Sequence, residues 1–260
     1  MTPTPRPAPL SIGASVARQL VAHAARDNAG WCDLFTRTHG IMGRTDRDAW
    51  TSPVRTPQGY PDAVTLRPGV DIAALLSRVD TASPACSVKD SYDDLDLSPH
   101  GFHELFRATW IAYPGAVAHP GADREAPIPG APWSLVTRPE DLRAWEAGWG
   151  HRSRERFFRP ELLATPGVSV LASWDGAELL AGAILTTTGA EPVVGVSNVF
   201  MAGGEVGDAW AGILAWTVAH HPGLPLVGYE AGDDLAAALD AGFQALGPLR
   251  IWMADDALDE

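Results

Sequence analysis

The second half of the chain alternates apolar runs with helical patterns in a regular order. Residues 192–201 (PVVGVSNVFM) are apolar and rich in valine, which is typical of a strand buried on both faces. Residues 209–220 (AWAGILAWTVAH) carry apolar side chains at helical spacing, and 224–229 (LPLVGY) predict a second short buried strand. A helix over 233–241 and a strand over 243–252 complete the run. This order predicts an α/β fold.

Shorter elements are expected before this run. Apolar patterns predict strands over 133–137, 168–174 and 178–188. The last two are joined through Asp175-Gly176, a dipeptide that favours a hairpin turn. Residues 139–148 open with proline and two acids, which predicts the first turn of a helix. The hairpin and the strand at 192–201 should therefore form three antiparallel strands.

The first half carries a sparser version of the same alternation. A helix is expected over 11–26, with a pattern that can continue to Thr38, and the proline-broken stretch 41–60 is expected to be irregular. The other expected elements of this half are strands at 63–66 and 85–89, a helix at 71–79 capped by Asp71 and a long strand or strand pair at 102–113, whereas a helical turn is expected at 159–163 in the second half.

An internal comparison relates the two halves. In each, an apolar strand is followed by Asp-Asp-Leu, then Gly-Phe, then a strand that carries a tryptophan. These features lie at 88–110 in the first half and at 227–252 in the second. The spacings differ by a few residues, so the order indicates either a degenerate repeat or a coincidence.

A proline- and glycine-rich stretch separates the halves. It covers residues 114–130 and is typical of a linker. We therefore predict a reduced domain over 11–113 and a full domain over 131–256. Residues 1–10 are rich in proline and are expected to form a loose tail.

The turn after the valine-rich strand has a chemical use. Residues 202–208 (AGGEVGD) hold three glycines directly before a helical pattern. Backbone N–H groups at a helix start form an electropositive pocket for phosphate, and glycine lets a ligand approach the main chain. The stretch is either a phosphate-binding loop or a structural turn.

Two short motifs and the order of elements resemble the GNAT-type N-acetyltransferases. Residues 204–209 (GEVGDA) fit most of that family's pattern Q/R-x-x-G-x-G/A, and Ala241-Gly242-Phe243 resembles the x-G-F that follows its last helix. Gly204 stands where the family has Gln or Arg, so one side-chain contact to phosphate is missing. The resemblance implies tandem GNAT-like domains with a mixed, mostly antiparallel sheet, flanking helices and a splayed central strand pair.

The resemblance also implies a cofactor, acetyl-CoA or another acyl-CoA. Its pantetheine arm would pair with backbone between the strands at 192–201 and 224–229. The implied contacts are backbone groups of Val199, Phe200 and Met201 for pantetheine and of Gly204, Val206, Gly207 and Ala209 for pyrophosphate. In the first half the corresponding stretch 66–70 contains a proline, which lacks an N–H group, so we predict that this half binds no CoA.

Acyl transfer to an amine needs a base for the ammonium proton, a donor to the thioester carbonyl and an acid for the departing thiolate. The family's usual acid is a tyrosine at the position of Ala238, so this chain departs from the pattern. The candidates nearby are Tyr229 and Glu230 at a strand end, and Ser197 and Asn198 on the central strand. Glu230 is either the base or a surface acid. A buried Asn198 would need hydrogen-bond partners.

The repeat places one more group of residues. If both halves share a sheet, the first half would line the acceptor pocket, with Asp90, Tyr92 and Trp110 as candidates for substrate binding. No cluster has the spacing of a metal site. Cys32 and Cys86 are expected to be buried thiols, with a nucleophilic role as the alternative.

Composition narrows the class of partner. The net charge of −13 disfavours nucleic acid, including transfer RNA, and anionic membranes. No apolar run approaches a membrane span and no signal peptide is present, so we expect a cytoplasmic monomer or homodimer.

The expected function is transfer of an acyl group from acyl-CoA to a small-molecule amine or amino acid. A cationic substrate would suit the acidic chain. The alternatives are another thioester chemistry on the same fold, either decarboxylation or acyl transfer from a carrier protein, and a non-catalytic binding module that has lost CoA.

Overall fold

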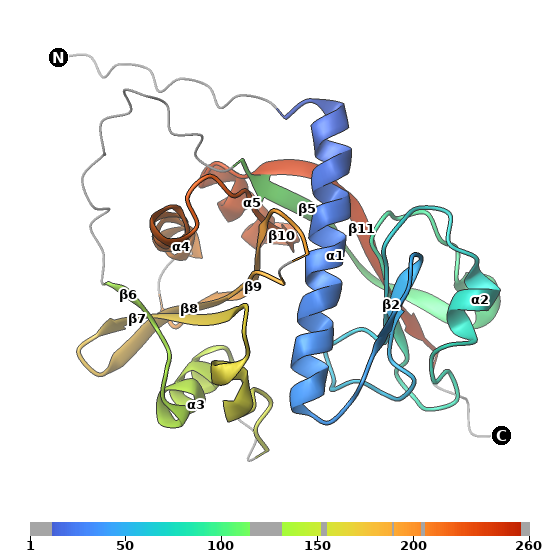
Figure 1. The fold of residues 1–260 in the computed structure, drawn as a ribbon, viewed down its shortest axis with the longest axis horizontal. Helices are drawn as coiled ribbons and strands as arrows, with labels where there is room; N and C mark the ends of the chain where they lie inside the picture. Colours follow the sequence, from blue (N-terminus) through green and yellow to red (C-terminus); the bar gives the residue numbers. More distant parts are fainter. Residues whose placement is uncertain (1–11, 115–131, 152–154, 189, 204–205, 256–260) are drawn as a thin grey trace.

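The computed structural model describes residues 12–114, 132–151, 155–188, 190–203 and 206–255. In these residues, helices flank one open, mostly antiparallel sheet (Figure 1), which confirms the predicted α/β class. The strands are β1 Arg44–Thr45, β2 Ala49–Thr51, β3 Ala63–Thr65, β4 Ser87–Asp90, β5 Phe102–Tyr113, β6 Trp133–Leu135, β7 Val168–Asp175, β8 Glu178–Thr186, β9 Val194–Met201, β10 Leu226–Glu230 and β11 Gln244–Ala254. The α-helices are α1 Ala14–Thr38, α2 Ile72–Leu76, α3 Pro139–Gly148, α4 Val206–His220 and α5 Gly232–Asp240, and the 3-10 helices are η1 Ser98–His100 and η2 Pro160–Ala164.

The order of strands shows that the two halves of the chain interleave. The sheet runs β1-β2-β3-β4-β11-β5-β10-β9-β8-β7-β6. The last strand of the second half, β11, therefore lies between β4 and β5, while β5 of the first half lies between β11 and β10. The predicted linker at 114–130 and the tail at 1–10 lie almost wholly outside the described residues, and the domain boundaries stay predictions.

The pairings repeat when the sheet is read inward from each end. On one side β2–β3 is antiparallel, β3–β4 parallel and β4–β11 antiparallel. On the other side β8–β9 is antiparallel, β9–β10 parallel and β10–β5 antiparallel. This succession is what an internal repeat would produce. The degeneracy of the first copy stays a prediction.

Helix α1 crosses the middle of the molecule and contacts both halves (Figure 1). It packs on β9, β10 and β11 as well as on β3, and it extends to Thr38 as its apolar pattern allowed. At its carboxyl end, the ring of Phe35 stacks on Tyr60 of the first half at 3.8 Å and meets Phe158 of the second half edge-on at 5.7 Å. The helix thereby joins the cores of the two halves.

The stretch 41–60 is more ordered than its prolines indicated. It contains β1 and β2, and the prediction of a wholly irregular segment was wrong. Trp50 in β2 is fully buried and its Nε1 donates to the Asp33 carboxylate of α1 at 3.0 Å. This long-range contact holds a strand too short to show a periodic pattern. The stretch 102–113 forms one long strand, not a pair.

A buried carboxylate ties α1 to the second half. Asp27 is 2% exposed and accepts hydrogen bonds from the Thr186 hydroxyl at 2.7 Å and from the Thr188 N–H at 3.4 Å. Burial raises the pKa of Asp27 to about 6. The carboxylate lies over Gly195 of β9, where an added Cβ would stand 1.8 Å from Asp27 Oδ2. Only glycine therefore leaves room for this contact.

We expect Gly195→Ala to destabilise the protein by about 1–3 kcal/mol, because the new methyl group overpacks the site of Asp27. The measurement is the urea midpoint of unfolding. Gly247→Ala in β11 is the matched control, since the φ of Gly247 is not positive and a Cβ there meets nothing within 4 Å. Equal midpoints for the two variants would contradict the packing described.

Candidate functional site

The parallel strands β9 and β10 separate after a short contact. Their pairing covers Leu226 with Val194 and Val227 with Gly195. At Gly228 the strands are still close, because an added Cβ would lie 2.9 Å from the carbonyl oxygen of Val196. Beyond this point no further pair forms between the two strands. The predicted splayed strand pair is therefore present, and it leaves backbone groups of both strands without a partner strand.

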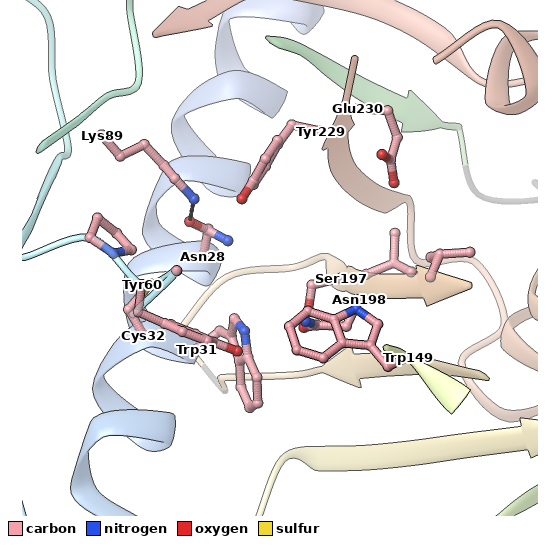
Figure 2. Close-up of a pocket in the computed structure, with 14 residues that line it drawn as sticks. Asn28, Trp31, Cys32, Tyr60, Lys89, Trp149, Ser197, Asn198, Tyr229 and Glu230 are labelled. Atoms are coloured by element: carbon pink, nitrogen blue, oxygen red, sulfur yellow. Dashed lines mark hydrogen bonds between the residues drawn. The ribbon is translucent and has the colours of Figure 1, made fainter. Parts of the chain in front are cut away.

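A bulge in β9 lies beside the opening. The register against β8 shifts between Gly182, which pairs with Phe200, and Ile184, which pairs with Ser197. Asn198 takes a φ of +53°, a left-handed conformation that asparagine tolerates better than most residues. Such strained positions are concentrated at functional sites. Ser197 and Asn198, at this bulge, line the space where the two strands separate (Figure 2).

A cavity of about 250 Å³ lies where the strands part. Both halves of the chain and helix α1 contribute to it, and Figure 2 shows their side chains pointing toward one another. The lining residues are Asn28, Trp31, Cys32, Gly59, Tyr60, Pro61, Lys89, Trp149, Val196, Ser197, Asn198, Val199, Tyr229 and Glu230. The interleaved sheet therefore builds one shared site, as the first half was expected to wall the pocket.

Glu230 is the acidic residue in this lining. It stands at the end of β10, and burial raises its pKa to about 8, with the nearby charge of Asp234 adding to the shift. Within the described part of the chain, no cation lies within 4 Å of its carboxylate. A cavity-lining carboxyl with a raised pKa is a candidate for acid–base chemistry.

Lys89 and Tyr229 line the same cavity and contact each other. The ammonium of Lys89 lies 4.1 Å from the centroid of the Tyr229 ring and donates to Asn28 Oδ1 at 2.7 Å. On its other side the Tyr229 ring meets Trp110 edge-on at 5.5 Å. These contacts fix the phenol ring at the entrance to the space between β9 and β10.

The turn after β9 leads into the amino end of α4. The helix begins at Val206, and the first N–H groups of an α-helix have no partner within the helix. A Cβ added at Gly203 or Gly207 would meet nothing within 4 Å, so the main chain is open to a ligand there. Gly204 lies outside the described residues, and its predicted phosphate contact stays a prediction.

The corresponding turn of the first half is closed by its own contacts. The N–H of Gly69 donates to the Asp94 carboxylate at 2.7 Å, and the N–H of Ala74 donates to Asp71 at 2.8 Å. Asp71 thereby caps α2, as predicted, and the helix has only five residues. Amide groups that are already paired offer little to a diphosphate, so the second half fits the cofactor better.

Comparisons with known proteins concern the fold. Neither a family model nor a curated protein matches this sequence. A GCN5-related N-acetyltransferase from Kribbella flavida has a TM-score of 0.56 at 15% identity, over 95% of this chain and 97% of that one. The acetyltransferase of the GNAT family from Novosphingobium aromaticivorans has a TM-score of 0.52 at 11% identity, over 90% and 99% of the two chains.

The chain has the GNAT fold. A functionally unknown conserved protein from Staphylococcus epidermidis, with a TM-score of 0.50 at 9% identity over 82% of this chain and 93% of that one, is also similar. At identities this low, the structural similarity establishes the architecture alone. In the GNAT fold described here, β9 and β10 are the splayed pair and α4 follows the glycine turn.

Of the predicted cofactor contacts, Val199 lines the cavity. The Phe200 side chain, by contrast, is 8% exposed and packs edge-on against Trp145 at 5.0 Å. Met201 pairs with Ala181 of β8 at the end of the strand. Only their backbone groups were predicted to bind, and these assignments stay predictions. Ala209 is fully buried in the first turn of α4.

The four predicted catalytic residues line one cavity, whereas the predicted substrate residues do not line it. Asp90 is fully buried and accepts from the backbone N–H groups of Leu95 and Tyr92. The Tyr92 hydroxyl donates to the Leu66 carbonyl, and Trp110 Nε1 donates to the Ser91 carbonyl. These contacts indicate structural roles, and substrate binding by Asp90, Tyr92 and Trp110 stays a prediction that their positions do not favour.

Sequence patterns missed several residues of the site. Asn28 lies within α1, and its side-chain oxygen accepts a hydrogen bond from Lys89. Tyr60 and Trp149 come from a segment expected to be irregular and from the end of α3. Lys89 carried one signal, because it is the only lysine of the chain. Cys32 is buried, and burial raises its pKa to about 11, which disfavours a thiolate nucleophile.

Replacing Gly207 by aspartate should weaken acetyl-CoA binding by roughly tenfold or more, because a carboxylate at the start of α4 repels the diphosphate. Isothermal titration calorimetry measures the effect. Gly207→Ala adds a methyl group into open space and should bind within about twofold of the unsubstituted protein. Similar affinities for the two variants would show that diphosphate does not bind at α4.

Proposed function

We propose that the protein transfers an acyl group from acetyl-CoA, or a related acyl-CoA, to the amino group of a small molecule. The observation that carries this proposal is the opening between β9 and β10, where the half-buried Glu230 lines the cavity. An acyl-CoA would supply an activated thioester. Backbone groups of Val199 to Met201 and the N–H groups at the start of α4 would hold it.

Glu230 would act as the base. An amine acceptor is mostly an ammonium ion near neutral pH and must lose a proton before its nitrogen forms a bond to the acyl carbon. Burial raises the pKa of Glu230 to about 8, which makes its carboxylate a stronger base than an ordinary glutamate. The ammonium proton moves to Glu230 first; the neutral nitrogen then forms the C–N bond, the C–S bond breaks, and the departing thiolate takes a proton from an acid.

Ser197 and Asn198 would orient the reacting carbonyl. Ser197 Oγ is buried and has no hydrogen-bond partner in the described part of the chain. A buried hydroxyl without a partner is costly, so a ligand group at this position would be favourable. The bulge at Asn198 places both residues at the point where the strands separate.

Tyr229 is the candidate acid for the departing thiolate. Ala238, at the family's tyrosine position, is fully buried in the core beside Phe243 and Trp210, so it lies outside the cavity. Tyr60 is the other phenol in the lining, but burial raises its pKa well above the ordinary value of 10, which makes it a poor proton donor. Tyr229 is thus the better placed phenol.

The acceptor is proposed to be small because the cavity of about 250 Å³ is enclosed by residues from both halves. Decarboxylation or acyl transfer from a carrier protein would use the same opening. A non-catalytic role would not account for the carboxyl of Glu230 in the cavity lining.

We also propose, from the charge of −13, that nucleic acid and anionic membranes are not partners. No helix in the described residues is long and apolar enough to cross a membrane.

The direct test combines binding with turnover. Acetyl-CoA at one hundred times its dissociation constant should stabilise the protein by about 2.7 kcal/mol, seen as a higher melting temperature. Release of free thiol from acetyl-CoA should then depend on an added amine. Stabilisation with amine-independent thiol release would favour another thioester chemistry, and the absence of stabilisation would remove the cofactor from the proposal.

Glu230→Gln should lower the rate of acyl transfer by roughly 100-fold or more, because the base is lost. In the unsubstituted protein the rate should rise with pH through about 8, since only the carboxylate accepts the proton. The pH dependence of kcat/KM measures both effects. A profile that is flat between pH 6 and 9 would rule out Glu230 as the base.

The same substitution has a signature in stability. The pKa of Glu230 rises from an ordinary 4.5 to about 8 on folding, so its contribution to stability is present below pH 4.5 and is lost as the pH rises to about 8. Glu230→Gln should therefore be more stable than the unsubstituted protein at pH 9, but not at pH 4.5. Melting temperatures at the two values provide the check.

A further inference from the structure

Lys89 is an unusual cation for this chain. It is the only lysine in the sequence, and it is 2% exposed, although lysine is rarely buried in proteins. It belongs to β4 of the first half and lines the cavity that opens between β9 and β10 of the second half. The interleaved sheet and α1 bring it there.

The charge of Lys89 is not balanced by the protein. Within the described residues, no carboxylate lies within 4 Å of its ammonium, and its two contacts are the neutral amide of Asn28 and the ring of Tyr229. Other cations of low exposure are paired, as Arg55 is with Asp62 and Arg250 with Asp93. A buried charge without a counter-ion is costly, so an anionic ligand would be strongly favoured beside Lys89.

The cavity therefore carries a cationic group on one wall and an acidic group on another. Lys89 lies on the side of the first half, Glu230 lies at the end of β10, and the Tyr229 ring stands between them (Figure 2). An acyl-CoA arm between β9 and β10 would approach from the side of Glu230. The wall that carries Lys89 is thus left to the acceptor.

We propose that the acceptor is an amino acid or a related zwitterion, whose carboxylate binds Lys89 while its amino group faces Glu230. This inference rests on the proposed acyl transfer and names its substrate class. Lys89 is a specificity-determining residue in this arrangement, because it contacts the acceptor away from the reacting atoms.

A second cavity indicates where the side chain of the acceptor would lie. It has a volume of about 420 Å³, shares Tyr60, Lys89 and Tyr229 with the first, and continues along β5 and β11. Its far part is apolar and includes Leu105 and Phe106, which are 47% and 43% exposed. An apolar side chain would cover this surface. Phenylalanine is therefore the first acceptor to test.

The experiment uses three matched probes with the full chain. Phenylalanine carries both charged groups, phenethylamine lacks the carboxylate, and 3-phenylpropanoate lacks the amine. With acetyl-CoA as donor, kcat/KM for phenylalanine should exceed that for phenethylamine by about 30-fold or more. Lys89→Met should remove this difference. Binding of 3-phenylpropanoate, followed by thermal shift, should be present in the unsubstituted protein and absent in Lys89→Met.

Two controls separate this inference from the proposed function. Acetyl-CoA affinity should be the same in Lys89→Met and in the unsubstituted protein. If the unsubstituted protein does not bind acetyl-CoA at all, the proposed function fails, whatever the acceptor. Arg143→Met removes the same charge from an exposed position of α3 and should leave all three probes unchanged.

Several outcomes would overturn the inference. One is equal turnover of phenylalanine and phenethylamine, and another is failure of 3-phenylpropanoate to stabilise the unsubstituted protein. A third is a Lys89→Met protein that loses preference for succinyl-CoA over acetyl-CoA, which would place the carboxylate on the donor. A melting temperature of Lys89→Met well below that of the unsubstituted protein, together with no binding of the carboxylate probe, would make Lys89 a structural residue.

Discussion

The backbone ladder of β5 holds the two halves of the chain in one sheet. This strand of the first half pairs with β10 along one edge and with β11 along the other. Two strands of the second half are therefore held in the sheet by one strand of the first half. Every hydrogen bond of this ladder joins residues that are far apart in the sequence. Loss of β5 would expose both β10 and β11, and the shared cavity would lose its frame.

The splay of β9 and β10 follows from local chemistry at a few residues. Close packing of Gly195 under Asp27 and of Gly228 beside Val196 draws the strands together at one end. Past that point β9 carries the bulge at Asn198 and forms no further pair with β10. The result is a pair of strands with free backbone groups and a half-buried carboxyl at the opening, which is a suitable arrangement for a thioester and an amine.

Buried charge explains why the site draws on both halves. Lys89 is buried and Glu230 is half-buried, but Tyr229 separates them and they form no ion pair within 4 Å. Among the described residues, folding therefore leaves two ionisable groups without an ionic partner, and a ligand with complementary groups recovers that free energy. A salt bridge between them would be more stable and would leave little affinity for a zwitterion.

The sequence by itself determined the local elements of the second half and the set of residues beside the splay. Valine-rich strands, the glycine turn and helical spacing are short-range patterns, so β9, α4, β10, α5 and β11 could be predicted to within a few residues, together with Glu230, Tyr229, Ser197 and Asn198. Only the tertiary structure decided that β11 lies between β4 and β5 and that β5 lies between β11 and β10. It also decided that β1 and β2 exist, and that Asn28, Tyr60 and Lys89 line the same cavity. These features depend on pairings across more than one hundred residues in some cases, and no local pattern of polar and apolar positions records which distant strand or side chain will be the partner.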